Sequence, residues 1–199
     1  GRSYTVASHN LPSARGQGEP VTGRINPPSG ATFEGIMAGE DTQLYLLASD
    51  AGYGFVAALG DLQSKNKAGK AAIKLPKGSE VIQPAQIESV DDSFVVAVTN
   101  EGRMLLFPLP ELPQLAKGKG NKIISIPPAR VQSREEFVIA VQVISAADAL
   151  VVYAGKRHLK LKFSELEHYQ GERGRRGNKL PRGFQKVDAI AVERVPKPS

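Results

Sequence analysis

Residues 44–56, with the sequence LYLLASDAGYGFV, decide the fold class of this 199-residue chain. An apolar, β-rich run ends at Ser49, and a second apolar run begins at Tyr53, just after Asp50-Ala51-Gly52. Asp and Gly between two such runs are typical of a β-hairpin, because glycine supplies the positive φ angle that a tight turn needs. The stretch therefore predicts two antiparallel strands joined by a short turn.

The same arrangement recurs along the chain with a period of about 50 residues. The stretches FVVAVTNEGRMLLF at 94–107 and LVVYAGKRHLKL at 150–161 each contain a hairpin glycine, and GRSYTV at 1–6 matches the second strand alone. The leading glycines are 51, 50 and 53 residues apart, at Gly1, Gly52, Gly102 and Gly155. Because no strand precedes Gly1, we expect this chain to be a piece of a longer protein.

Each unit continues past the hairpin with the same features in the same order. A polar or acidic residue followed by Leu comes about ten residues after each glycine: Asn10-Leu11, Asp61-Leu62, Glu111-Leu112 and Glu165-Leu166. A Gly-rich basic stretch and a short apolar strand follow, and in three units this strand ends near a proline: Pro28, Pro76 and Pro127. One such unit cannot bury both faces of its sheet, so neighbouring units must pack face to face, as propeller blades do.

The sequence therefore predicts an all-β fold, an open (broken) β-propeller or β-pinwheel built from four-stranded blades of about 50 residues. We expect one domain over residues 1–192 and a flexible tail over 193–199. Within the domain we expect a partial blade followed by three complete ones, over about 1–43, 44–93, 94–148 and 149–192. A β-sandwich is the alternative, but it would have to match four ordered features by chance. The exact number of blades and the closure of the ring stay open.

Positive charge is concentrated in three segments that contain no acidic residue. The chain has a net charge of +6, and residues 62–79, 112–134 and 173–187 hold sixteen of its 26 Lys and Arg. These segments occupy equivalent positions in their units, so an array should place them on one edge. A row of cations interspersed with glycines suits a regularly charged polyanion backbone, which accepts hydrogen bonds from both side chains and main chain. The pattern predicts sequence-independent binding of duplex DNA.

The sequence offers little for other functions. The chain has no Cys, and its histidines, His9, His158 and His168, do not share a metal-ligand spacing. The five tyrosines fall mostly in or beside strands, where packing is their expected role, so we expect no catalytic activity. The rival interpretation is a protein-interaction propeller whose basic rim binds an acidic partner. No apolar run reaches the roughly 20 residues of a membrane span, and no signal peptide is evident, which favours a soluble, cytoplasmic protein.

The repeat resembles that of the C-terminal domain family shared by the A subunits of DNA gyrase and topoisomerase IV. The segments LPSARGQG at 11–18, ASDAGYGF at 48–55, KGKGNKI at 117–123 and GERGRRG at 171–177 look like the topoisomerase IV branch. The gyrase A subunits carry a Gln-Arg-Arg-Gly-Gly-Lys-Gly box, of which this chain has no intact copy. This departure puts chiral DNA wrapping in doubt and favours topoisomerase IV over gyrase.

The resemblance implies a domain that binds and bends duplex DNA on its outer rim and steers substrate DNA for decatenation and supercoil relaxation in chromosome segregation. It implies that the catalytic tyrosine lies outside this chain and that the domain needs no cofactor, whereas the parent enzyme uses ATP and Mg²⁺ elsewhere. The implied partners are duplex DNA, the B subunit of topoisomerase IV through other regions, and in some bacteria condensin, with no small-molecule substrate. The implied location is the nucleoid, with a peripheral place at the inner face of the membrane as a further option.

The candidate DNA-binding residues come from the basic loops and from the last hairpin. They are Arg15, Lys65, Lys67, Lys70, Lys117, Lys119, Lys122, Lys156, Arg157, Arg173, Arg175, Arg176, Lys179 and Arg182.

Overall fold

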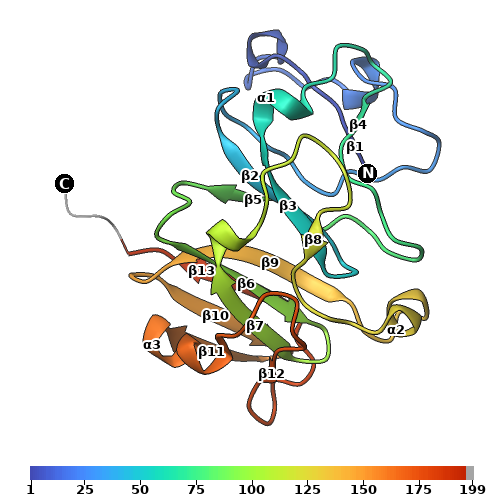
Figure 1. Cartoon of the computed structure of the whole chain (residues 1–199). Coiled ribbons are helices and arrows are strands. Elements are labelled where there is room, and N and C mark those ends of the chain that lie inside the picture. The colour runs from blue at the N-terminus through green and yellow to red at the C-terminus, as the bar shows by residue number, and fades with distance from the viewer. Residues whose placement is uncertain (196–199) are drawn as a thin grey trace.

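The structure is a computed structural model that describes residues 1–195, and most of its regular structure is short antiparallel strands grouped in sheets. We call the three larger sheets the first, middle and last blades (Figure 1). The first blade has the order β5-β2-β3-β8, from β2 (Leu44–Ser49), β3 (Tyr53–Ala58), β5 (Ala85–Ile87) and β8 (Asn121–Lys122). The middle blade has the order β12-β7-β6-β9, from β6 (Ser93–Thr99), β7 (Arg103–Pro108), β9 (Val138–Ser145) and β12 (Asn178–Lys179). The last blade has the order β11-β10-β13, from β10 (Ala149–Ala154), β11 (Arg157–Lys162) and β13 (Ala189–Glu193).

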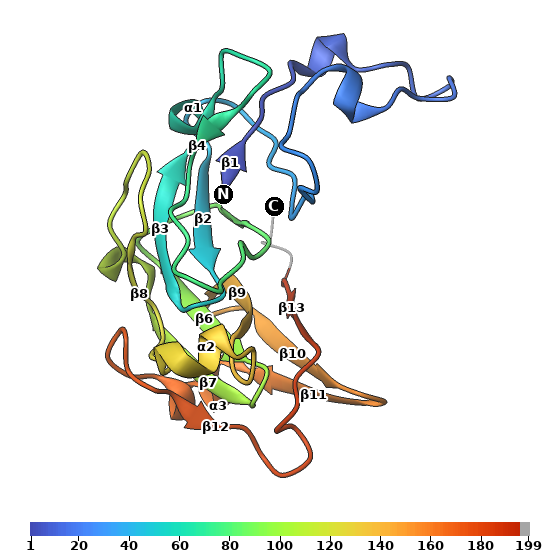
Figure 2. The same cartoon turned by 90° about the vertical axis from the view of Figure 1, so that its right-hand side faces the viewer.

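The segment before the first blade, residues 1–43, contains little regular structure. Strand β1 (Arg2–Ser3) pairs with β4 (Lys70–Ala71), and two 3-10 turns follow, η1 (Ser8–Asn10) and η2 (Val21–Gly23). Figure 2 shows that this N-terminal segment extends away from the blades. The partial first unit thus contributes one short strand, β1, whose partner β4 comes from the unit that follows.

The acid-Leu motif forms a helical turn at the end of each hairpin. These turns are α1 (Leu59–Leu62), η3 (Leu109–Glu111) and α3 (Phe163–Leu166), the last followed by η4 (Glu167–Tyr169). The leucines of these three motifs are buried, Leu62, Leu112 and Leu166, whereas Leu11 of the first unit is 56% exposed. The turn therefore reverses the chain while it places one apolar side chain in the core. The remaining helix, α2 (Pro128–Gln132), precedes β9.

The predicted hairpins are present, and their glycines have a steric role. In the first blade Leu47 pairs with Phe55, and in the middle blade Ala97 pairs with Leu105. Gly102 has a φ of +72°, and a Cβ there would lie 2.5 Å from the carbonyl oxygen of Phe184. Any other residue would be strained and would also clash, so glycine is required at this turn.

The fourth strand of each complete blade comes from the unit that follows in sequence. Strand β8 follows the middle hairpin in the chain but pairs with β3 of the first blade. Strand β12 follows the last hairpin but pairs with β7 of the middle blade. The four-stranded sheets are therefore not contiguous segments of the chain, and adjacent units are joined by backbone hydrogen bonds as well as by side-chain packing.

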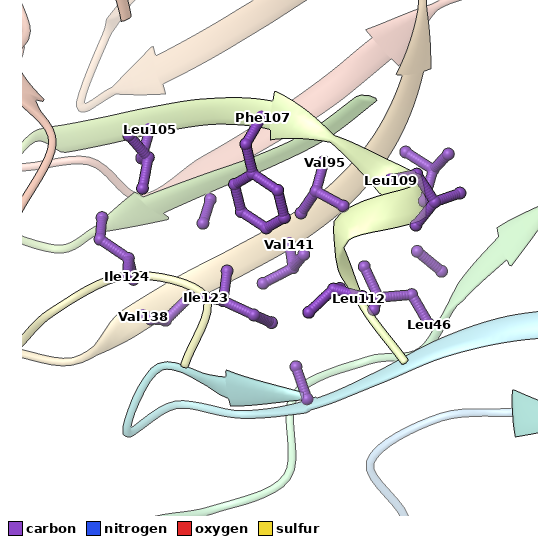
Figure 3. Packing of buried hydrophobic residues seen from close by; sticks show 14 of the residues in the cluster. Leu46, Val95, Leu105, Phe107, Leu109, Leu112, Ile123, Ile124, Val138 and Val141 are labelled. Atoms are coloured by element: carbon purple, nitrogen blue, oxygen red, sulfur yellow. The ribbon is translucent and has the colours of Figure 1, made fainter. Parts of the chain in front are cut away.

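The hydrophobic core consists of two layers, one on each side of the middle blade. Val95, Leu105 and Phe107 pack toward Leu46 and Ile123 of the first blade (Figure 3). On the opposite face, Val96, Val98, Met104 and Leu106 share a cluster with Leu150 and Val152 of the last blade. Because both faces are covered, β6 is a nearly continuous apolar run rather than an alternating one.

The sheets do not close into a ring. Strands β5, β9 and β13 contact one another in turn and form the inner edges of the blades, whereas β8 and β12 lie at the outer edges. The last blade has no fourth strand within the described residues. The prediction of an all-β, open propeller is confirmed.

The first three residues of the predicted tail, 193–195, contact the rest of the domain. Glu193 ends β13, and residue Arg194 and the backbone N–H of Val195 contact the carboxylate of Asp148. The rest of the predicted tail, residues 196–199, lies outside the described residues. Within residues 1–195, no helix has the length and apolar content that crossing a membrane requires.

Substitution of Phe107 tests whether the layer between the first and middle blades is part of the hydrophobic core. The ring is fully buried between the first and middle blades, so Phe107→Ala should lower the free energy of unfolding by about 3–5 kcal/mol through lost burial and a cavity. Phe33→Ala is the matched control, because Phe33 is 54% exposed, and its effect should stay below about 1 kcal/mol. Denaturant unfolding measures both, and equal losses in the two variants would contradict this assignment of the core.

Candidate nucleic-acid interface

Each basic loop crosses to the blade before its own and lies at that blade's outer edge. Lys70 belongs to β4, which pairs with β1, and Lys122 ends β8, which pairs with β3. Lys179 ends β12, which pairs with β7. The three loops therefore occupy equivalent places in space, because the same pairing recurs in each unit.

A glycine in each loop makes this approach possible. Gly69, Gly120 and Gly177 directly precede the paired strands and have φ angles of +74°, +79° and +76°. A Cβ on Gly177 would lie 2.6 Å from the carbonyl oxygen of Met104, and a Cβ on Gly120 would collide with the carbonyl of Gly54. These glycines are needed for the backbone to reach the preceding strand.

Further backbone hydrogen bonds fix the end of each loop. In the first three units, the carbonyl of the leading glycine accepts an N–H from the residue that follows the loop strand of the next unit. The donor–acceptor distances are 3.1 Å for Ala72 to Gly1, 2.7 Å for Ile123 to Gly52 and 2.8 Å for Leu180 to Gly102. The hairpin glycine thus serves twice, as the turn residue and as the acceptor for the next unit.

Each basic loop also accepts a backbone hydrogen bond from the unit before it. The N–H of Asn26 donates to the carbonyl of Lys67 at 2.7 Å. The N–H of Lys74 donates to the carbonyl of Gly118, and that of Ser125 to the carbonyl of Arg175, both at 2.9 Å. Figures 1 and 2 show β4, β8 and β12 following one another along the molecule. We call this continuous surface, formed by residues 65–70, 117–122 and 173–179, the basic stripe.

Most lysines of the basic stripe are exposed. Lys119 lies over the ring of Tyr53, with its Nζ 4.4 Å from the ring centroid, and Lys70 donates to the carbonyl of Asp61 at 2.6 Å. The exposed predicted residues of the stripe are Lys65, Lys67, Lys70, Lys117, Lys119, Lys122, Arg175 and Lys179. These side chains present a row of cations to solvent.

Four predicted residues lie beyond the stripe. Arg15 lies in the N-terminal segment, residues 1–43, outside the three loops of the stripe. Lys156 and Arg157 lie at the tip of the last hairpin, and Arg182 follows β12. A Cβ on Gly183 would lie 2.5 Å from Nη1 of Arg157, so the tip of the last hairpin lies against the segment that follows the stripe.

The three arginines of loop 171–177 are largely engaged within the protein, which the sequence did not indicate. Arg176 donates to Glu136, which is fully buried, through both Nη atoms, with the Nη1–Oε1 bond at 2.7 Å. Arg173 donates to the carbonyl of Lys122 at 2.7 Å, and Arg175 forms an exposed pair with Glu172. Arg176 therefore holds the loop in place, because a carboxylate inside the protein is its partner.

The charge on Glu136 depends on this contact. Burial acts to raise the pKa of Glu136, but the hydrogen bonds and charge of Arg176, with Thr99 and Arg130, lower the pKa below its ordinary value of 4.5. Arg130 Nε lies 3.4 Å from the carboxylate. A group with a lowered folded pKa stabilises the fold above its unfolded pKa and loses this effect as the pH falls through the folded value.

Glu136→Gln should therefore change how stability depends on pH. At pH 7 the variant should lose about 3 kcal/mol of unfolding free energy, the scale for removing one charge of a buried pair. The difference from the unaltered chain should begin to shrink as the pH falls below about 4.5, where Glu136 of the unfolded chain takes up a proton, and it should vanish below the lower pKa of the folded chain. Denaturant unfolding across this range checks the prediction, and a pH-independent difference would contradict it.

A cavity of about 790 Å³ lies away from the basic stripe and opens among the segments that lead into the inner strands. Its lining includes Arg134 and Lys186 but also five acidic residues: Glu34, Asp50, Glu80, Glu101 and Asp188. Its charge does not suit a phosphate backbone. Within residues 1–195, the side chains do not gather into groups of three or more metal-ligating acids or histidines.

Known proteins with similar sequences share this architecture. The family model for the DNA gyrase C-terminal domain, a β-propeller, matches residues 43–88 and 93–145. The C-terminal domain of Escherichia coli ParC is 47% identical with a TM-score of 0.88, and the match covers 97% of this chain and 78% of that one. This chain belongs to the family of C-terminal domains of topoisomerase IV A subunits.

Full-length relatives agree with this assignment. The A subunit of DNA topoisomerase 4 from Pseudomonas aeruginosa is 58% identical over 197 residues, which cover 99% of this chain and 26% of the relative. The Escherichia coli K12 counterpart is 48% identical over 193 residues, which cover 97% of this chain and 25% of the relative. The chain thus spans about a quarter of the length of the curated relatives it matches. A gyrase A C-terminal domain at 16% identity and a TM-score of 0.66 shares the fold.

Proposed function

We propose that this domain binds duplex DNA through the phosphate backbone along the basic stripe and bends it. The observation that carries the proposal is the chain of hydrogen bonds that joins the three loops of the basic stripe on one outer edge. Lys and Arg on such an edge can neutralise successive phosphates without reading base sequence. The membership of the chain in a topoisomerase family supports the same function.

Membership of the family supports a proposal for the role of the domain in the parent enzyme. We propose that it steers DNA for decatenation and supercoil relaxation in chromosome segregation, as part of an ATP- and Mg²⁺-dependent enzyme whose catalytic groups lie in other domains. The B subunit of topoisomerase IV, through other regions, and condensin are proposed partners of the parent protein. DNA binding would place the domain with the nucleoid in the cytoplasm, and the described residues offer no separate support for a position at the inner membrane.

Charge reversal at two exposed lysines from different loops tests whether duplex DNA binds along the basic stripe. Lys117→Glu with Lys179→Glu should weaken binding to a duplex of any sequence by more than about tenfold and reduce the slope of log affinity against log salt by about 2. Both side chains are exposed, so the fold should be retained. Electrophoretic mobility shift or fluorescence anisotropy at several salt concentrations measures both effects.

Lys77→Glu with Lys186→Glu is the matched control, because it changes the net charge equally at residues that belong to the acid-free segments but lie outside the basic stripe. Lys186 lines the 790 Å³ cavity, and Lys77 precedes Gly78, whose carbonyl accepts a hydrogen bond from the cavity residue Arg134. This control should keep the salt slope of the unaltered chain. Equal effects of the two variants on duplex affinity would contradict the assignment of DNA binding to the basic stripe. If the unaltered chain at micromolar concentration retains no duplex, an acidic protein partner is favoured instead.

A further inference from the structure

The 790 Å³ cavity has a charge opposite in sign to that of the whole chain. It lies where hairpin turns meet the segments that lead into the inner strands β5, β9 and β13, and we call it the hub cavity. Among its charged residues, Arg134 is bound to Asp50 at 2.8 Å, which leaves Lys186 against four carboxylates: Glu34, Glu80, Glu101 and Asp188. The hub cavity is therefore a local negative region on a chain whose net charge is +6.

Three of these four carboxylates have no cationic partner within residues 1–195. They are Glu34, Glu101 and Asp188, and all three are exposed. They come from separate parts of the chain. Glu34 reaches the cavity because the N-terminal segment packs against the segment before β5, where a Cβ on Gly35 would lie 2.7 Å from Cδ of Pro84. A cationic ligand can thus reach these carboxylates without displacing a basic residue of the domain.

Apolar side chains share the lining with these charges. The partly exposed ones are Val81, Ile82, Phe137 and Ile139. A ligand that carries positive charge alone would leave this apolar surface in contact with water, whereas apolar groups between its cations would cover the surface. The lining therefore suits a ligand that combines positive charge with apolar groups.

The backbone around the hub cavity has groups that an extended chain can bind. Strands β5 and β13 lie at the edges of their sheets, and within the described residues no strand pairs with their inner edges. The pairing of β9 with β6 skips Ile139, which is the extra residue of a β-bulge. A bulge residue stays out of the ladder, and an open strand edge can accept an added peptide strand through main-chain hydrogen bonds.

We propose that the hub cavity binds an extended basic segment of a partner protein, in which Lys or Arg side chains alternate with apolar ones. The cations pair with Glu34, Glu101 and Asp188, and the apolar side chains cover Ile82 and Ile139. Alternation follows from the extended conformation, because successive side chains point to opposite sides of the peptide. The proposal goes beyond DNA binding and does not depend on it, since the cavity lies away from the basic stripe.

Other ligand classes fit the hub cavity less well. Duplex DNA is disfavoured because its phosphates would be repelled by the carboxylates. A small polyamine would match the charge but would leave the apolar lining uncovered and the main-chain groups unused. A basic, partly apolar peptide uses the carboxylates, the apolar lining and the strand edges together.

The test measures binding of a fluorescein-labelled peptide, Lys-Val-Lys-Val-Lys-Val, to the 199-residue chain by fluorescence anisotropy. Glu34→Gln with Glu101→Gln, in one variant, removes two cavity carboxylates from different segments. Affinity for the peptide should fall by about tenfold, because two exposed charge pairs are lost. Asp91→Asn with Asp92→Asn is the matched control, since both residues are exposed and do not line the cavity, and its affinity should stay within about twofold of the unaltered chain.

Three results would overturn the proposal. The unaltered chain does not bind the peptide at near-millimolar concentration, the two variants lose affinity equally, or spermidine, which carries the charge of three lysines, displaces the labelled peptide as well as the unlabelled peptide does. The Lys117–Lys179 variant should keep its affinity for the peptide, because its substitutions lie on the basic stripe. Failure of DNA binding and failure of peptide binding are therefore separate results.

Discussion

The structure depends on one backbone interaction, the pairing of each basic loop with the outer strand of the preceding blade. This pairing covers a strand edge that would otherwise be open, and it links neighbouring units by hydrogen bonds as well as by apolar contact. It also decides where the charge lies. Because the loop glycines Gly120 and Gly177 sit against the carbonyls of Gly54 and Met104, the lysines beside them must lie on the outer edge.

Buried ion pairs reinforce the connections between units. Glu136 binds Arg176 of the last basic loop, and Asp50 in the first hairpin accepts a hydrogen bond from Arg134, 2.8 Å away. Both carboxylates are buried, so each needs its partner to offset the cost of desolvation. A part of the positive charge therefore stabilises the fold, and the exposed lysines remain for a polyanionic ligand.

The sequence predicts the repeat because the hairpin glycines and apolar runs recur at nearly constant spacing. It also predicts that the basic loops share an edge, since equivalent positions of an array lie together. It does not predict the exchange of strands, because a two-residue strand such as Asn121–Lys122 has no periodic signal of its own. Nor does it distinguish Arg176 from its neighbours, because the partner Glu136 lies 40 residues away and resembles any other loop acid.

Native-state hydrogen exchange tests strand exchange most directly. The amides of Ile123 and Leu180 donate to Gly52 and Gly102 of the preceding units, so they should be protected as strongly as the amide of Val96 in the central strand. In Gly120→Ala the protection of Ile123 should fall, while that of Val96 persists. Fast exchange of Ile123 and Leu180 in the unaltered chain would contradict the account, because the loops would then not be bound to the outer edge.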